Sequence, residues 1–197
     1  MALAAQAPVN IYTVEEYFEL EKNSKIKHEF VNGKLIGTPK EAREANEIAT
    51  NLVVLMKPSL RKKGFKIYDH DVRTIVKENG IYRYPDVVVT HITDDSDKYM
   101  IKQPILLVEV ASEDSAKTDR EIKLEEYSKI ESVQYYLIID QNLMRVEMYS
   151  RSHGNRWFYD QFTQPTDIVE LPIFEQNLLL ADIYEDVVFK TIPKIAV

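Results

Sequence analysis

The sequence predicts a mixed α/β fold, in which helices flank a central sheet that continues into antiparallel β extensions. Three apolar runs of strand length predict the buried centre of this sheet: Asp86–Thr90, Pro104–Ala111 and Tyr135–Ile139. Between the second and third runs lies a charged segment, Ser112–Ile130, which has helical periodicity from about Lys117. The order strand, strand, helix, strand favours a mixed α/β sheet.

The composition is that of one soluble globular domain. The chain has 197 residues, of which 45% are hydrophobic and 29% are charged, and these values suit a single core. Residues 1–10 are expected to form a flexible tail, and residues 11–197 a single domain. The N-terminus lacks the basic segment of a signal sequence, and no apolar run approaches the ~18 residues of a membrane span. A cytoplasmic protein with no membrane partner is therefore expected.

The absence of cysteine limits the possible chemistry. With no thiol and four histidines in the chain, disulfides, thiolate nucleophiles and cysteine-based metal sites are excluded, which leaves oxygen and imidazole ligands. This ligand set favours a hard cation over zinc. The net charge of −7 argues mildly against indiscriminate nucleic-acid binding, but it is compatible with an acidic site whose charge is reversed by metal ions.

Capping, turn and spacing signals predict the remaining elements. Thr13 is a candidate N-cap for a helix that reaches about Glu21, and Asn-Gly between extended segments predicts a hairpin over His28–Ile36. A helix is expected over Pro39–Lys63, where the Pro58 ring should kink or end it. Short strands are expected at Phe65–Tyr68 and Val72–Val76, an antiparallel extension at Met144–Ser150, Arg156–Phe162 and Ile168–Leu171, and a last short element around Leu180–Tyr184.

Two of the apolar runs contain a carboxylate. Glu109 lies inside the second run, where period-two alternation places it on one face with apolar side chains, and Asp86 opens the first run directly after Pro85. A buried carboxylate is costly unless it is paired or binds a cation, so these acids predict a metal site. The alternatives are that Glu109 lies near solvent or pairs with an arginine, and that Asp86 is a turn or edge residue.

The helical segment carries one lysine on its predicted core face. Residues spaced by four, four and three positions line one stripe, which comprises Asp119, Lys123, Tyr127 and Ile130. Lys123 is therefore expected to point towards the acids of the sheet, unless its aliphatic stem carries the ammonium out to solvent. Two carboxylates that bind a cation, together with an ammonium, suit phosphodiester hydrolysis. The metal would polarise the phosphate and generate hydroxide, while the lysine would stabilise developing charge or orient the water.

These residues resemble the Uma-two family of restriction-endonuclease-like proteins, which belongs to the PD-(D/E)XK nuclease superfamily. The resemblance covers roughly residues 11–185, and its motifs are Thr13–Tyr17, Glu29 before Asn32-Gly33, Asp86, Glu109, Asp119–Lys123, Tyr127 and Val133–Asp140. It implies a restriction-endonuclease-like fold, cleavage of DNA that depends on Mg²⁺ or Mn²⁺, and a homodimer.

The resemblance also implies roles for individual residues. In the superfamily a lysine usually follows the strand acid by two residues, but that position here is Ala111. The family instead implies a lysine moved to the following helix, which maps onto Lys123. It further implies that Asp86, Glu109 and the backbone carbonyl of Val110 hold the metal, and that Glu29 is an additional acid.

Three positions depart from the family pattern. Ala45 stands where the family often has a histidine, three residues before Ile48, while Gln134 replaces an acid and Tyr136 a tryptophan. The alternative function is therefore a nuclease-like fold that has lost catalysis and serves as a binding or dimerisation module.

Other polar and aromatic groups are interpreted as structural. His70, between Asp69 and Asp71, is interpreted as an exposed polar residue, because neighbouring side chains in a strand point to opposite faces. Stabilisation by the helix dipole is favoured over phosphate binding for the cationic side chains near the C-terminus of the helix expected over Pro39–Lys63, which are Lys57, Arg61, Lys62, Lys63 and Lys66. Core packing or a dimer interface is favoured over base stacking for Trp157, Phe158, Tyr159 and Phe162.

Overall fold

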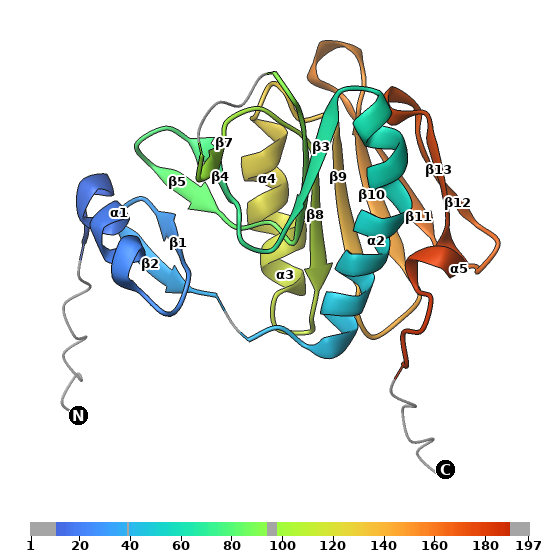
Figure 1. Cartoon of the computed structure of the whole chain (residues 1–197), viewed down its shortest axis with the longest axis horizontal. Helices are drawn as coiled ribbons and strands as arrows, with labels where there is room; N and C mark the ends of the chain where they lie inside the picture. The colour runs from blue at the N-terminus through green and yellow to red at the C-terminus, as the bar shows by residue number, and fades with distance from the viewer. Residues whose placement is uncertain (1–10, 39, 94–97, 190–197) are drawn as a thin grey trace, which may run out of the picture.

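The computed structural model describes residues 11–38, 40–93 and 98–189, so the predicted tail at residues 1–10 lies outside the described ranges. Within these ranges the strands form sheets of five, six and two strands. The six-stranded sheet lies in the middle, with the five-stranded sheet and α1 on one side and the two-stranded sheet on the other (Figure 1). The predicted mixed α/β fold is confirmed, while the single domain stays a prediction.

The six-stranded sheet contains all three apolar runs as neighbouring strands. Its order is β11-β10-β9-β8-β6-β3. The β8–β9 pair is parallel and the other pairs are antiparallel, so the sheet is mixed as predicted. The strands are β3 (Phe65–Asp69), β6 (Val87–His91), β8 (Pro104–Ala111), β9 (Tyr135–Asp140), β10 (Val146–Arg151) and β11 (Trp157–Phe162).

Helices cover both faces of this sheet. The α2 helix (Arg43–Lys62) packs on the face that contains Leu106 and Val108 of β8. The opposite face, which contains Leu107, packs on a continuous helical segment formed by α3 (Ala116–Thr118), the π-helical turn η1 (Asp119–Lys123) and α4 (Leu124–Ser128). The alternation predicted for β8 is therefore confirmed, and burial of each such leucine stabilises the fold by about 1.5–3 kcal/mol.

The five-stranded sheet packs against α1 (Val14–Asn23), and the α3–α4 segment lies between this sheet and the six-stranded sheet (Figure 1). The predicted N-cap is confirmed, because Thr13 and Glu16 form a capping box. The hairpin is also confirmed: Asn32 and Gly33 have φ values of 47° and 90°, as its tight turn requires. The strands are β2 (Lys34–Gly37), β1 (His28–Val31), β5 (Ile81–Arg83), β4 (Arg73–Lys77) and β7 (Met100–Ile101).

Two elements differ from the predictions. The α2 helix begins at Arg43 and continues through Pro58, so the proline does not end it; Val54, whose carbonyl loses its helical hydrogen bond to the proline, is 65% exposed, which leaves water to satisfy that carbonyl. β12 (Ile168–Leu171) does not extend the six-stranded sheet. It pairs with β13 (Gln176–Leu179) and, with α5 (Leu180–Ile183), contributes apolar side chains to the core beside α2. Within the described residues, no helix is long and apolar enough to cross a membrane.

Candidate active site

The strand register brings the two predicted acids together. Val87 of β6 pairs with Val108 of β8, and the next position of the same register sets Asp86 beside Glu109. The N–H of Val110 donates a hydrogen bond of 2.6 Å to Asp86 Oδ2. Asp86 is half-buried and Glu109 is only 4% exposed, so Glu109 does not lie near solvent.

Lys123 points into the protein and contacts these acids. Its Nζ lies 2.8 Å from Glu109 Oε2, 3.2 Å from Asp119 Oδ1 and 3.8 Å from Glu29 Oε1. The hydroxyl of Tyr127 donates to Glu109 Oε1 at 2.7 Å. All members of the predicted stripe are buried, and the partner of Glu109 is a lysine rather than an arginine. The structure thus brings the four predicted side chains, Glu29, Asp86, Glu109 and Lys123, into one region.

A π-helical turn sets the direction of both Asp119 and Lys123. Such a turn is wider than an α-helical turn and often occurs at functional sites. Asp119 and Lys123 are buried at its two ends, whereas Ile122 between them is 50% exposed. The hydroxyl of Tyr136 donates to the carbonyl of Asp119 at 3.0 Å and ties the turn to β9. The spacing in the sequence predicted that Asp119 lies on the core-facing stripe, but it did not predict the contact of Asp119 with Lys123.

Glu29 is held by an arginine that the sequence did not single out. Arg83 of β5 donates from Nη1 to Glu29 at 2.5 Å, and from Nε and Nη2 to the two oxygens of Glu126 at 2.9 Å each. This arginine joins β1 to α4 across the interior, since its side chain is 3% exposed. The sequence feature that could have drawn attention to Arg83 is its position three residues before Asp86, in the extended segment that precedes this acid.

The region contains more acids than cations. Lys123 and Arg83 are surrounded by the carboxylates of Glu29, Asp86, Glu109, Asp119 and Glu126. Burial raises the pKa of Glu109 to about 8 although the Lys123 ammonium opposes this shift, and burial likewise raises the pKa of Asp86 to about 6. Burial alone would lower the pKa of Lys123, but Glu109, Glu29 and Asp119 together raise it, so the ammonium stays charged at neutral pH. Acidic oxygens in excess over cations fit a hard divalent cation.

A histidine and another acid lie next to Asp86. The ligand atoms of Glu41, His70 and Asp86 lie within 4.8 Å of one another, which makes them a candidate metal-binding group. The interpretation of His70 as an exposed polar residue is wrong, because its side chain is only 18% exposed and Nδ1 lies 3.2 Å from Glu41 Oε1. The strand ends at Asp69 and His70 has a φ of 49°, so strand alternation does not apply to it.

The position of the expected family histidine has a packing role here. Ala45 is 5% exposed and belongs to the core cluster beneath α2. The amide nitrogen of the next residue, Asn46, lies 3.4 Å from His70 Nε2. An imidazole therefore lies close to this turn of α2, although it comes from the end of β3.

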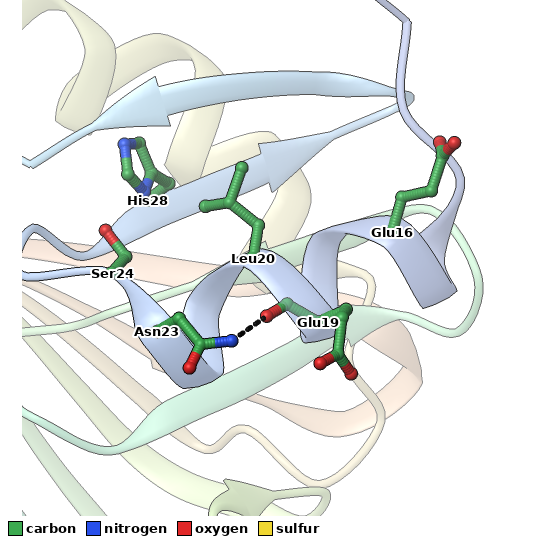
Figure 2. Close-up of a pocket in the computed structure, with 6 residues that line it drawn as sticks. All are labelled: Glu16, Glu19, Leu20, Asn23, Ser24 and His28. Atoms are coloured by element: carbon green, nitrogen blue, oxygen red, sulfur yellow. Dashed lines mark hydrogen bonds between the residues drawn. The ribbon is translucent and has the colours of Figure 1, made fainter.

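A separate surface hollow of about 620 Å³ lies beside α1. Figure 2 shows its lining, where the Asn23 side chain donates to the backbone carbonyl of Glu19 at 3.4 Å and His28 of β1 closes one side. None of its lining residues is Asp86, Glu109 or Lys123. We therefore place the candidate active site in the interior, not in this hollow.

The aromatic residues of β11 differ in their surroundings. Trp157 is half-buried, and the guanidinium carbon of Arg151 lies over its ring, 4.4 Å from the ring centroid. Phe158 and Tyr159 are 63% and 51% exposed, so these two do not pack in the core, and a dimer interface stays the prediction for them.

Comparisons with known proteins give the same family as the site residues. Residues 14–181 match the profile of the Uma2 family, described as "Putative restriction endonuclease". An uncharacterized Synechocystis protein, sll1609, is 32% identical over 155 residues, which span 77% of this chain and 87% of that protein. A second, slr1290, is 25% identical over 190 residues, or 96% and 100% of the two chains.

The fold is also that of a solved structure. The crystal structure of "a putative nuclease belonging to DUF820" from Anabaena variabilis has a TM-score of 0.75 and 17% identity, and the match covers 89% of this chain and 99% of that one. Because only 17% of the residues are identical, the similarity of the two structures shows a shared fold and nothing about activity. The match over residues 14–181 shows that the chain belongs to the Uma2 family.

Proposed function

We propose that the protein is an endonuclease that hydrolyses DNA phosphodiester bonds, with Mg²⁺ or Mn²⁺ as cofactor and a metal-activated water as nucleophile. The observation that carries this proposal is the buried contact of 2.8 Å between Lys123 and Glu109, beside the Asp86 that Val110 holds. An ammonium buried among an excess of carboxylates suits phosphodiester hydrolysis, because it would stabilise the negative charge that develops on a phosphate bound beside these carboxylates.

Asp86, Glu109 and the carbonyl of Val110 are the proposed metal ligands. Their donors are all oxygen, as Mg²⁺ and Mn²⁺ prefer. When bound, the cation would neutralise charge on the phosphate and lower the pKa of the attacking water. Tyr127 and Lys123 each occupy one oxygen of Glu109, and each oxygen retains a further lone pair for a cation.

Lys123 and Glu29 are proposed to act together. Because its neighbours raise its pKa, Lys123 donates hydrogen bonds and supplies positive charge and does not act as a base at neutral pH. Glu29 is the proposed auxiliary acid: it contributes negative charge 3.8 Å from the ammonium and would hold a metal through water. Arg83 and Asp119 keep these two side chains in place.

We also propose a homodimer, because cleavage of both DNA strands is naturally served by two-fold symmetry. Sedimentation equilibrium of the full chain tests this. A molar mass of twice 23.0 kDa is expected, and a monomer at micromolar concentration would contradict it.

The nuclease proposal is tested by cleavage of plasmid and single-stranded DNA with Mg²⁺ or Mn²⁺. We expect Asp86→Asn, Glu109→Gln and Lys123→Met each to lower the rate about 100-fold or more. Glu113→Gln and Lys117→Met change exposed residues near the same site and should cut like the wild type. Equal activity in all six proteins would overturn the proposal. An intact, metal-binding wild type that cuts no DNA would favour a binding module without catalysis.

A further inference from the structure

We infer that Glu41, His70 and Asp86 form a second divalent-cation site, which takes a first-row transition metal such as Mn²⁺ in preference to Mg²⁺. This inference rests on the proposed function, because Asp86 is common to both sites. Glu109 is not a member of the group, so Asp86 links the two sites.

The three ligand atoms come from three separate segments. Glu41 precedes α2, His70 follows β3 and Asp86 precedes β6. Each of the three side chains offers one ligand atom, and the three atoms lie within 4.8 Å of one another; among the described residues, this is the group of three or more such side chains that meets this distance. Metal–ligand bonds of about 2.0–2.2 Å place two ligand atoms up to ~4.4 Å apart around one ion, so small side-chain shifts would complete the site.

Two hydrogen bonds hold the backbone of His70 beside Asp86. The N–H of His70 donates to the carbonyl of Asp86 at 2.9 Å, and Lys27 Nζ donates to the carbonyl of His70 at 2.9 Å. The carboxylate of Glu41 repels that of Asp86, while His70 attracts it. A bound cation would relieve this repulsion, and so would a protonated imidazole, which makes an ion pair of His70 with Glu41 the competing explanation.

The imidazole determines which metal the site prefers. Mg²⁺ takes oxygen ligands and dehydrates reluctantly, whereas first-row transition metals bind imidazole nitrogen more readily; among them Mn²⁺ has the greatest preference for oxygen and Zn²⁺ binds histidine more tightly. His70 Nδ1 faces Glu41, and Nε2 lies 3.4 Å from the Asn46 amide. With the amide oxygen turned towards Nε2–H, Asn46 would fix the tautomer in which Nδ1 is the ligand.

The inference predicts different stoichiometries for the two metals. Metal-free full-length protein is titrated with Mn²⁺ while free Mn²⁺ is measured by electron paramagnetic resonance, and with Mg²⁺ by calorimetry. We expect two Mn²⁺ and one Mg²⁺ per chain. His70→Gln, Glu41→Gln and Glu109→Gln should each bind one Mn²⁺, whereas His153→Gln, which alters an exposed histidine, should still bind two.

Pulsed electron paramagnetic resonance of the bound Mn²⁺ gives a further signature, and the wild type can show it even where a variant does not fold. Coupling to a histidine ¹⁴N is expected in the wild type and in Glu109→Gln, and its loss is expected in His70→Gln. One Mn²⁺ that lacks nitrogen coupling and is lost in Glu109→Gln would overturn this inference and leave the proposed nuclease site standing. One Mn²⁺ with nitrogen coupling that survives Glu109→Gln would support this inference and contradict the ligands proposed above. No Mn²⁺ binding would overturn both.

Discussion

Lys123 places a buried ammonium 2.8–3.8 Å from three carboxylates, those of Glu109, Asp119 and Glu29. Burial of one charge is tolerated only with such compensation, and removal of one partner leaves the others uncompensated. The inward direction of Lys123 could be predicted from its spacing to Tyr127. The same stripe directed Lys123 towards the acids of the central sheet, but its contact with Glu29 of β1 depends on strand pairing across the sequence and could not be assigned from that spacing.

The first residue-scale prediction concerns Lys123→Met, which keeps an unbranched side chain of similar length but removes the ammonium group. At a pH above the Glu109 pKa of about 8, where this carboxylate is charged, we expect the metal-free variant to be destabilised by about 3–5 kcal/mol, because Glu109 and Asp119 lose their cation. Urea unfolding in EDTA measures this, with the exposed Lys117→Met as control, which should stay within about 0.5 kcal/mol of the wild type. A Lys123→Met protein as stable as its control would contradict the buried ion pair.

The second concerns pH. Burial raises the pKa of Glu109 from its ordinary 4.5 to about 8 in the folded protein. A carboxyl group with a raised folded pKa contributes stability that is complete below the unfolded value and is lost as pH rises through the folded value. Metal-free protein should therefore lose stability from about pH 4.5 to about pH 8, and Asp86 adds to this loss up to about pH 6.

Urea unfolding across this range, with EDTA present, compares wild type with Glu109→Gln. The variant has no carboxyl group at this position, so its stability should fall less between about pH 6 and about pH 8. Glu113→Gln, an exposed control, should follow the wild type. Parallel profiles for wild type and Glu109→Gln would show that the pKa of Glu109 is not raised.

At the scale of elements, local patterns predicted the central strands and the hairpin, because period-two runs and Asn-Gly depend on neighbouring residues alone. The same patterns did not show that β3 and β4 join different sheets, although β3 ends at Asp69 and β4 already begins at Arg73. Nor did they show the π-helical turn, since the spacing of Asp119 and Lys123 is equally compatible with an α-helix. His70 was misinterpreted for a related reason, because β3 ends one residue before it.

Arg83 connects three elements, so its substitution tests how the smaller sheet is held against α4. A lysine keeps the charge but has one nitrogen, whereas Arg83 uses Nε, Nη1 and Nη2 to reach Glu29 and Glu126. We expect Arg83→Lys to cost about 1–3 kcal/mol of stability in urea unfolding, because one buried carboxylate loses its partner. The exposed Arg156→Lys is the control. No difference between the two variants would show that the bidentate contact is unimportant.

At the scale of the whole molecule, the helical segment α3–α4 lies between the two larger sheets (Figure 1). Its Lys123 contacts Glu29 of β1 and Glu109 of β8, beside Asp86, which directly precedes β6. The chain has a net charge of −7, and around the candidate active site its carboxylates outnumber the two cations, Lys123 and Arg83. A phosphodiester is also negative, so DNA cleavage at this place requires a cation that the chain itself does not supply.

The most direct test is anomalous diffraction from a crystal of the full chain soaked in Mn²⁺, measured at the manganese absorption edge. We predict a peak within bonding distance of the Asp86 and Glu109 carboxylates and the Val110 carbonyl, and its loss in Glu109→Gln. A Mn²⁺-soaked crystal in which Lys123 still contacts Glu109, and no anomalous peak lies beside Asp86 or Glu109, would contradict the account.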